Sequence, residues 1–235
     1  GSNEAGASFF HRRGTIRADS GTLNILGSSI TTYEPGAIIQ GDNGTTINLS
    51  ANSVALGTGP GGASRIRPEA NGGFTLNIAA DRLVVHPGST TSSGTGTTTI
   101  QNFTSGTRIN LGGDDVSASD GNPATLGLSQ AEIASFTAGN LRFGSDTAGR
   151  ITVTQALSLP KIHITSKDDI RVNAALTATA TGALDAVVIN AGIDKSAGDK
   201  TGGNIIFESG GSITVSNTSR ATLYSGSLED STGLN

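Results

Sequence analysis

The sequence predicts an all-β protein in which short strands stack as the coils of a solenoid. Segments that alternate apolar and polar residues recur along all 235 residues, and this period of two is typical of half-buried strands. Hydrophobic residues make up only 34% of the chain and aromatic residues 4%, which is too lean for a compact sandwich. A solenoid needs fewer hydrophobic residues, because each coil buries only a thin apolar strip against its neighbours. The net charge of −4 and the regular alternation argue against disorder.

The predicted strands are three to five residues long, and Gly, Asn, Asp and Ser fill the turns between them. No Asn-Gly pair forms a clean two-residue turn between two strands, which favours stacked coils over hairpins. We also expect inward Asn residues at the turns to stack into ladders. The strands are expected at 21–25, 46–49, 74–78, 82–85, 99–103, 109–111, 162–164, 170–172, 187–189, 204–207, 213–215 and 221–223.

A central stretch, residues 107–153, is expected to contain three strands and the one convincing helix, residues 129–138. Ser129 is a good N-cap, and Glu132 three residues later completes a capping box. Ile133 and Phe136 share one face of this helix, and Gly139 is expected to end it. Because so short a helix is marginal alone, we expect it to lie on the strands as a lid. A partner-binding helix is the less favoured alternative.

Three segments are predicted to be surface loops. Residues 90–98 are rich in Ser, Thr and Gly, residues 112–124 contain Pro123, and residues 192–203 are rich in Gly, Asp and Lys. The strand pattern resumes directly after each loop, so none is expected to be a domain linker. We therefore predict a single solenoid over residues 1–235. Gly1-Ser2 without an initiator Met is interpreted as a cloning remnant ahead of an excised piece of a larger protein.

The strand segments resemble a known family. Gly-Asn-Ile-Ile-Phe, Gly-Ser-Ile-Thr-Val and Asp-Asp-Ile-Arg-Val-Asn-Ala are similar to the repeats of filamentous-haemagglutinin-like adhesins, and residues 125–153 resemble a recurring module of that family. The resemblance implies a right-handed parallel β-helix that forms part of a long bacterial fibre with a role in attachment. It also implies export by two-partner secretion through an outer-membrane transporter, and a secreted or cell-surface location. The absence of cysteine suits export of an unfolded chain.

Composition argues against several other classes. No basic stripe and few aromatic rings are present, so nucleic acid is not an expected partner. No apolar run is long enough for a membrane span, and no signal peptide is recognisable. Without cysteine, disulfides and thiolate metal sites are excluded. His11, His86 and His163 each lack a second ligand at a suitable spacing, so metal binding is not expected.

Two motifs suggest ligands only weakly. Residues 57–62 satisfy the dinucleotide pattern G-x-G-x-x-G after a strand, but the pattern needs a helix next, and residues 65–68 are expected to be a strand. Asp114, Asp115 and Asp120 crowd one loop and could chelate calcium. The spacing departs from a calcium loop, so a solvated acidic turn is the favoured interpretation.

The best enzymatic candidate is a charged cluster, since two carboxylates and nearby cations can supply acid and base roles on a glycan. It consists of Lys161, Lys167, Asp168, Asp169 and Arg171. A solvated charged turn is the favoured interpretation of this cluster as well. Outward Thr75, Thr152 and Thr214 raise the possibility of a flat ice-binding array. Because each of these strands carries a single such Thr, a regular array is not expected.

The sequence therefore predicts no catalytic, cofactor-binding or metal-binding residue and no cofactor. The favoured function is a structural or adhesive segment of a large surface or secreted adhesin. Its expected partners are a receptor or glycan on host cells or other bacteria, without nucleic acid or membrane insertion. The alternatives are a carbohydrate-active β-helix enzyme and an inert stalk of the same fibre.

Overall fold

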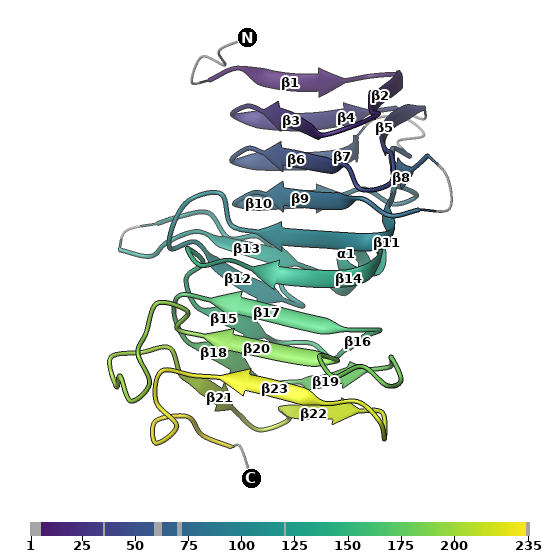
Figure 1. The fold of residues 1–235 in the computed structure, drawn as a ribbon. Helices are drawn as coiled ribbons and strands as arrows, with labels where there is room; N and C mark the ends of the chain where they lie inside the picture. The colour runs from purple at the N-terminus through teal and green to yellow at the C-terminus, as the bar shows by residue number, and fades with distance from the viewer. Residues whose placement is uncertain (1–5, 35, 59–62, 70–71, 120, 234–235) are drawn as a thin grey trace. The chain divides into compact units, whose positions relative to one another are not determined.

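The fold is a parallel β-helix, and this confirms the predicted fold class (Figure 1). The computed structural model describes all residues except 1–5, 35, 59–62, 70–71, 120 and 234–235. Neighbouring strands of successive coils pair in parallel. The chain divides into two compact units. The N-terminal unit comprises residues 1–103 and 131–141, and the C-terminal unit comprises residues 104–130 and 142–235.

The N-terminal unit is built from coils of three strands each, so that every third strand lies on the same face. One face carries β1, β4, β7 and β10, a second carries β2, β5 and β8, and a third carries β3, β6 and β9. The long strand β11 pairs with β8 at its start and with β9 at its end. The bounds are β1 (Ser8–His11), β2 (Gly14–Ala18), β3 (Thr22–Leu26), β4 (Ser29–Tyr33), β5 (Ala37–Gly41), β6 (Thr46–Ser50), β7 (Ser53–Thr58), β8 (Arg65–Pro68), β9 (Thr75–Ala79), β10 (Arg82–Val85) and β11 (Thr90–Gln101).

The core of this unit consists of inward side chains that repeat from coil to coil. In β6 the inward residues Ile47 and Leu49 are 0% and 1% exposed, whereas the other three residues of the strand are partly exposed. Ile47 lies in register with Leu76 of β9, which is also fully buried. The period of two therefore converts directly into a buried column along the stack.

The outward positions of the third face form a ladder of side-chain amides. Asn24, Asn48 and Asn77 occupy the same register position in β3, β6 and β9. The Asn48 Nδ2 donates to Asn24 Oδ1 at 2.7 Å, and the Asn77 Nδ2 donates to Asn48 Oδ1 at 2.8 Å. This ladder lies at outward strand positions, whereas the sequence predicted ladders of inward Asn residues at turns. The amides reach one another because outward residues of paired parallel strands lie only about 4.8 Å apart.

Outward threonines of this unit line up in a single column, which is not the flat array of several Thr rows that was considered for ice binding. Thr75 lies in register with Thr46 and Thr97, and Thr46 with Thr22. These residues form a second column beside the amide ladder. This column could not be recognised from the sequence, because the turns between the strands differ in length.

The C-terminal unit also stacks coils of three strands. One sheet has the order β13-β12-β15-β18-β21, another the order β16-β19-β22, and β17, β20 and β23 form the third face. Ile109, Ile151, Ile170 and Ile205 make one buried column across the first sheet. The bounds are β12 (Arg108–Leu111), β13 (Thr125–Leu128), β15 (Ile151–Val153), β16 (Leu157–Leu159), β17 (Ile162–Ser166), β18 (Ile170–Val172), β19 (Ala175–Ala178), β20 (Val187–Ala191), β21 (Ile205–Phe207), β22 (Ser212–Val215) and β23 (Ala221–Tyr224).

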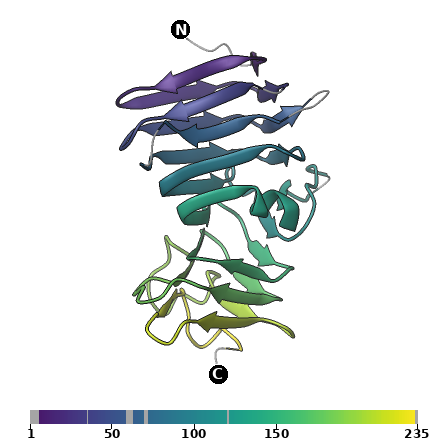
Figure 2. The ribbon, with the colours of Figure 1, turned by 90° about the vertical axis from the view of Figure 1, so that its right-hand side faces the viewer.

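The helix is half as long as predicted. It spans α1 (Gln130–Ala134), and the next element is the strand β14 (Phe136–Gly144) (Figure 2). Ile133 and Phe136 are both buried, as expected for a lid, but only Ile133 belongs to the helix. Glu132 accepts a hydrogen bond from the Val85 N–H at 3.2 Å, which fixes α1 to the end of β10.

The predicted role of Gly139 as a helix stop is therefore wrong. Gly139 lies inside β14, and a Cβ at this position would come within 2.3 Å of the Thr95 carbonyl oxygen. Close backbone approach within the N-terminal unit, and not a left-handed helix cap, requires glycine here. The stacking of β14 in the sheet outweighs the local helix signals.

The predicted loop at 90–98 is also wrong, because these residues belong to β11. Its inward residues Thr91, Ser93 and Thr98 are at most 1% exposed. The Thr98 hydroxyl donates to Ser93 Oγ at 2.9 Å. Small hydroxyl side chains therefore replace aliphatic ones in this part of the core, so that the composition resembles a loop. The predicted loops at 112–124 and 192–203 contain no strand or helix among their described residues.

Candidate functional site

The predicted charged cluster does not assemble into one site. Lys161 donates to Asp185 Oδ1 at 2.8 Å, whereas Arg171 donates to Glu208 Oε1 at 2.9 Å. Lys167 lies 3.7 Å from Asp194 Oδ2. Each of the three cations therefore pairs with a carboxylate of the following coil.

The two neighbouring carboxylates serve the backbone of the turn between β17 and β18. Asp168 Oδ1 accepts the Asp169 N–H at 2.8 Å, and Asp169 Oδ1 accepts the Asn204 N–H at 2.9 Å. The second bond ties this turn to the start of β21. One oxygen of Asp168 is thus used within its own turn, and one oxygen of Asp169 joins two stacked turns.

Part of the cluster nevertheless lines an open groove of about 350 Å³ in the C-terminal unit. The groove runs over the turns of four successive coils at one corner of the stack: those after β11, β14, β17 and β20. We call this feature the corner groove. Its lining consists of Ser105, Gly106, Thr147, Ala148, Gly149, Lys167, Asp168, Lys195, Thr201, Gly202 and Gly203.

Backbone hydrogen bonds along the stack hold the floor of the corner groove. The Gly106 N–H donates to the Thr147 carbonyl at 2.8 Å, and the Lys167 N–H donates to the Ala148 carbonyl at 3.1 Å. Glycine is required at Gly149, because a Cβ there would lie 2.3 Å from the Gly106 carbonyl oxygen. The absence of side chains at these glycines leaves the groove open above the stacked turns.

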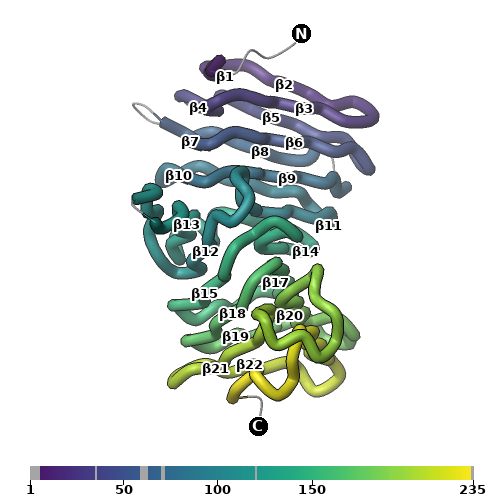
Figure 3. Tube along the Cα trace, turned by 90° about the vertical axis from the view of Figure 1, so that its left-hand side faces the viewer, coloured from purple at the N-terminus to yellow at the C-terminus, as the bar shows by residue number. Residues whose placement is uncertain are grey.

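One wall of the corner groove is the long loop between β20 and β21, visible as a yellow-green loop in Figure 3. The loop is narrow at its base, where Gly192 and Gly203 approach so closely that a Cβ on either would lie 2.6 Å from the other Cα. Gly198 donates its N–H to the Gly226 carbonyl at 2.6 Å, which ties the loop to the chain after β23. The wall is therefore held at its base and at its middle.

Lys195 and Thr201 are the polar groups of this wall. The Lys195 Nζ donates to Thr201 Oγ1 at 3.0 Å and lies 3.7 Å from Asp199 Oδ2. Hydrogen bonds from the Thr201 hydroxyl and N–H, together with the Lys195 charge, lower the pKa of Asp199. The groove thus presents ammonium donors, hydroxyls and a carboxylate to a ligand, and it suits recognition of a small polar group.

The predicted acidic turn has a structural use. Asp115 Oδ1 accepts the Gly127 N–H at 2.9 Å, which ties the turn to β13. Asp120 lies outside the described residues. Among the residues that the structure describes, no three His, Cys, Asp or Glu side chains are placed to hold a metal ion.

Two of the three histidines are anchored to the backbone. His11 Nε2 lies 3.0 Å from the Gly14 carbonyl oxygen, and His163 Nε2 lies 2.9 Å from the Asp185 carbonyl oxygen. Partial burial of the His163 ring, together with the nearby charges of Arg142 and Lys161, lowers the pKa of this imidazole. His163 points away from the strip that Ile162 and Ile164 bury, as predicted.

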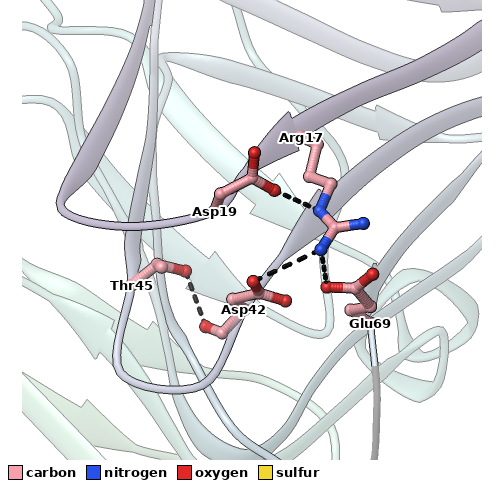
Figure 4. Close-up of polar contacts among 5 residues, drawn as sticks. All are labelled: Arg17, Asp19, Asp42, Thr45 and Glu69. Carbon is pink, nitrogen blue, oxygen red and sulfur yellow. Dashed lines mark hydrogen bonds and ion pairs between the residues drawn. The ribbon is translucent and has the colours of Figure 1, made fainter.

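A charged cluster in the N-terminal unit was not predicted from the sequence (Figure 4). The guanidinium of Arg17 lies against Asp19, Asp42 and Glu69, which follow β2, β5 and β8 on three successive coils. A hydrogen bond to Asp42 raises the pKa of Glu69. The sequence signal is an acidic residue after each strand of one face, but it appears only once the register of the coils is known.

The dinucleotide pattern at 57–62 leads into no helix. Residues 59–62 lie outside the described residues, and Arg65–Pro68 form the strand β8. The prediction of a strand after the pattern is confirmed.

Comparisons with known proteins identify no relative. No protein-family model matches the chain, and no curated protein or solved structure is detectably similar to it. Within the part of the chain that the structure describes, no helix has the length and apolar character needed to span a membrane.

Proposed function

We propose that the chain is an attachment segment of a large bacterial adhesin that is secreted or exposed at the cell surface. Its partner would be a receptor or glycan on a host cell, another bacterium or a matrix. The parent chain would leave the cell through an outer-membrane transporter. The proposal starts from the resemblance of the strand segments to filamentous-haemagglutinin-like repeats, and the parallel β-helix is the fold which that resemblance implies.

The corner groove is the observation that carries the proposal. Lys167, Lys195 and Thr201 stand on turns that hydrogen bonds fix to their neighbours along the stack. Rigid backbone reduces the entropy lost when a ligand binds. A β-helix that served only as a spacer would not need polar side chains held around a hollow.

Binding to a glycan array and to cultured epithelial cells tests the proposal. The labelled chain is compared with the double variant Lys167→Gln/Lys195→Gln and with Lys161→Gln as the matched control, because the Lys161 ion pair with Asp185 lies outside the groove. We expect saturable binding that falls at least about tenfold in the double variant and stays unchanged in the control.

Absence of saturable binding by the unaltered chain would contradict the proposal and favour an inert stalk. Equal binding by the chain and the double variant would keep the attachment role but move it to another surface, such as the loop at 112–124.

A further inference from the structure

We propose that the corner groove binds a linear, uncharged glycan chain that lies along the stack, with about one sugar residue over each coil. This inference rests on the proposed attachment function and names the ligand chemistry of the groove.

The direction of the groove follows from the turns that form it. Gly106, Ala148, Lys167 and Gly203 belong to turns of successive coils at one corner. Consecutive turns are joined by backbone hydrogen bonds of 2.8 Å from Gly106 to Thr147 and 3.1 Å from Lys167 to Ala148. The groove therefore extends along the stack and across the strands, so a bound chain must be extended in the same direction.

The repeat of the groove is the spacing of parallel strands, about 4.8 Å per coil. A pyranose ring in an extended, 1,4-linked chain advances by a similar distance. Because successive rings of a β-1,4-linked chain are flipped over, equivalent hydroxyls of alternate sugars would meet equivalent positions of alternate turns. The volume of about 350 Å³ is at the small end of the range for ligand sites, which suits a narrow chain lying in an open groove.

The polar groups of the groove both donate and accept. The Lys167 Nζ is 3.7 Å from Asp194, beyond hydrogen-bond distance, so its ammonium retains N–H groups for a ligand. Asp168 uses Oδ1 to accept the Asp169 N–H, which leaves Oδ2 as an acceptor for a ligand. A sugar hydroxyl donates and accepts at once, and it can satisfy both kinds of group.

The charges around the groove favour a neutral ligand. Lys195 lies 3.7 Å from Asp199, as Lys167 does from Asp194. Both lysines are thus partly compensated, and the lining carboxylate Asp168 adds a further negative charge. A polyanion would meet these carboxylates, and a polycation would meet the two ammonium groups.

The lining also argues against a protein ligand. It contains no aromatic side chain and no aliphatic one larger than Ala148, whereas tight protein interfaces depend on aromatic and Arg anchors in pockets. Without an aromatic platform each sugar is held weakly. Affinity then has to accumulate over several sugars and over several copies of the chain.

The test is a titration with linear oligosaccharides of one to six residues, followed by NMR chemical shifts of the intact 235-residue chain. The neutral probes are β-1,4-linked gluco- and manno-oligosaccharides, and the acidic probes are oligogalacturonides of equal length. We expect the affinity for at least one neutral series to rise with each residue up to about four and then to level off, since the groove covers four turns. Lys167→Gln/Lys195→Gln should weaken this binding at least about tenfold, and Lys161→Gln should not.

Three outcomes would overturn the inference. The first is no length-dependent binding of either neutral series. The second is tighter binding of oligogalacturonides that disappears in about 0.5 M salt, because this indicates attraction by charge alone. The third is shift changes confined to residues outside the groove. Cell or glycan-array binding that persists in any of these cases would leave the attachment function standing and exclude only this ligand.

Discussion

The two units of the molecule stack the same kind of coil, and ion pairs join coils in both, but among the described residues a ladder of side-chain amides joins coils in the N-terminal unit alone. In the N-terminal unit, Asn24, Asn48 and Asn77 connect three coils through neutral amide hydrogen bonds. In the C-terminal unit the outward contacts between coils include ion pairs, such as Lys161 with Asp185 and Arg171 with Glu208. The inward columns are mostly aliphatic in both. The core thus sets the fold, and the outward contacts are free to differ with the use of each surface.

The difference between the amide ladder and the ion pairs bears on function. In an amide ladder each Asn donates to one neighbour and accepts from the next, so the ladder can extend over any number of coils. These donors and acceptors are bonded within the protein. Ion pairs between mobile side chains can rearrange, and Lys167 near Asp194 is one such pair. The C-terminal unit therefore holds charged groups that a ligand can recruit.

Removing a buried side chain should be costly in both units. Leu76 lies between Ile47 and Thr98 in register, and Ile189 lies between Ile164 and Leu223. Both are 0% exposed. We expect Leu76→Ala and Ile189→Ala each to lower the free energy of unfolding by about 2–5 kcal/mol, measured by urea denaturation. A loss below about 1 kcal/mol in only one unit would show that the two cores are not equivalent.

The fold was predictable because the inward pattern is local. Ile162 and Ile164 on either side of His163 indicate a half-buried strand without any knowledge of neighbours. The ladder was not predictable, because Asn24, Asn48 and Asn77 become neighbours only through turns of unequal length. Thr75 was correctly placed on an outward face, but its column could not be recognised for the same reason.

The secondary structure of the segments around β11 and α1 was predicted wrongly for another physical reason. Residues 90–98 have the composition of a loop, yet Thr91, Ser93 and Thr98 point inward and are buried. Ser129 and Gly139 carry strong local helix signals, yet Gly139 lies in a strand because Thr95 approaches it closely. Tertiary packing overrides local propensity at both places. The corner groove was found only in part, since Lys167 and Asp168 were singled out from the sequence but Lys195 was not.

The amide ladder should contribute more than a single side-chain hydrogen bond of the C-terminal unit. Asn48 makes two ladder bonds, whereas Asn110 accepts one bond from the Thr154 hydroxyl at 2.8 Å. We expect Asn48→Ala to cost about 1–2 kcal/mol and Asn110→Ala about half as much, measured by urea denaturation. Thr46→Ala, on the same strand as Asn48, serves as the control and should change stability by less than about 0.5 kcal/mol. Equal losses for Asn48 and Thr46 would mean that the ladder is not a stabilising element.

The ion pairs should respond to salt, and the ladder should not. The Lys161 side chain is 29% exposed and that of Asp185 is 50% exposed, so solvent screens their attraction. A hydrogen bond from Lys161 and its charge lower the pKa of Asp185. We expect a double-mutant cycle of Lys161→Gln and Asp185→Asn to give a coupling of about 0.2–1 kcal/mol. In about 0.5 M salt this coupling should shrink, while the Asn48–Asn77 coupling should stay constant. A salt-independent Lys161–Asp185 coupling would contradict the proposed contrast.

The smallest effect is a pair of opposite pH dependences within the N-terminal unit. Hydrogen bonds from Arg13 and Arg12 lower the pKa of Glu34, whereas the hydrogen bond to Asp42 raises the pKa of Glu69. A carboxyl whose pKa is lowered by folding stabilises the protein above its unfolded pKa and loses this effect as the pH falls through its folded pKa. One whose pKa is raised stabilises the protein below its unfolded pKa and loses this effect as the pH rises through its folded pKa.

Glu34→Gln and Glu69→Gln separate these two contributions, because glutamine keeps the shape of the neutral carboxyl and cannot ionise. As the pH rises from the acid range to neutrality, the stability of Glu34→Gln relative to the unaltered chain should fall. The relative stability of Glu69→Gln should rise over the same range. Thermal unfolding midpoints across this pH series measure both trends. If both variants shifted in the same direction, Arg17 would determine the pKa of Glu69 as Arg13 determines that of Glu34. The charged cluster around Arg17 would then be a set of ion pairs like those of the C-terminal unit.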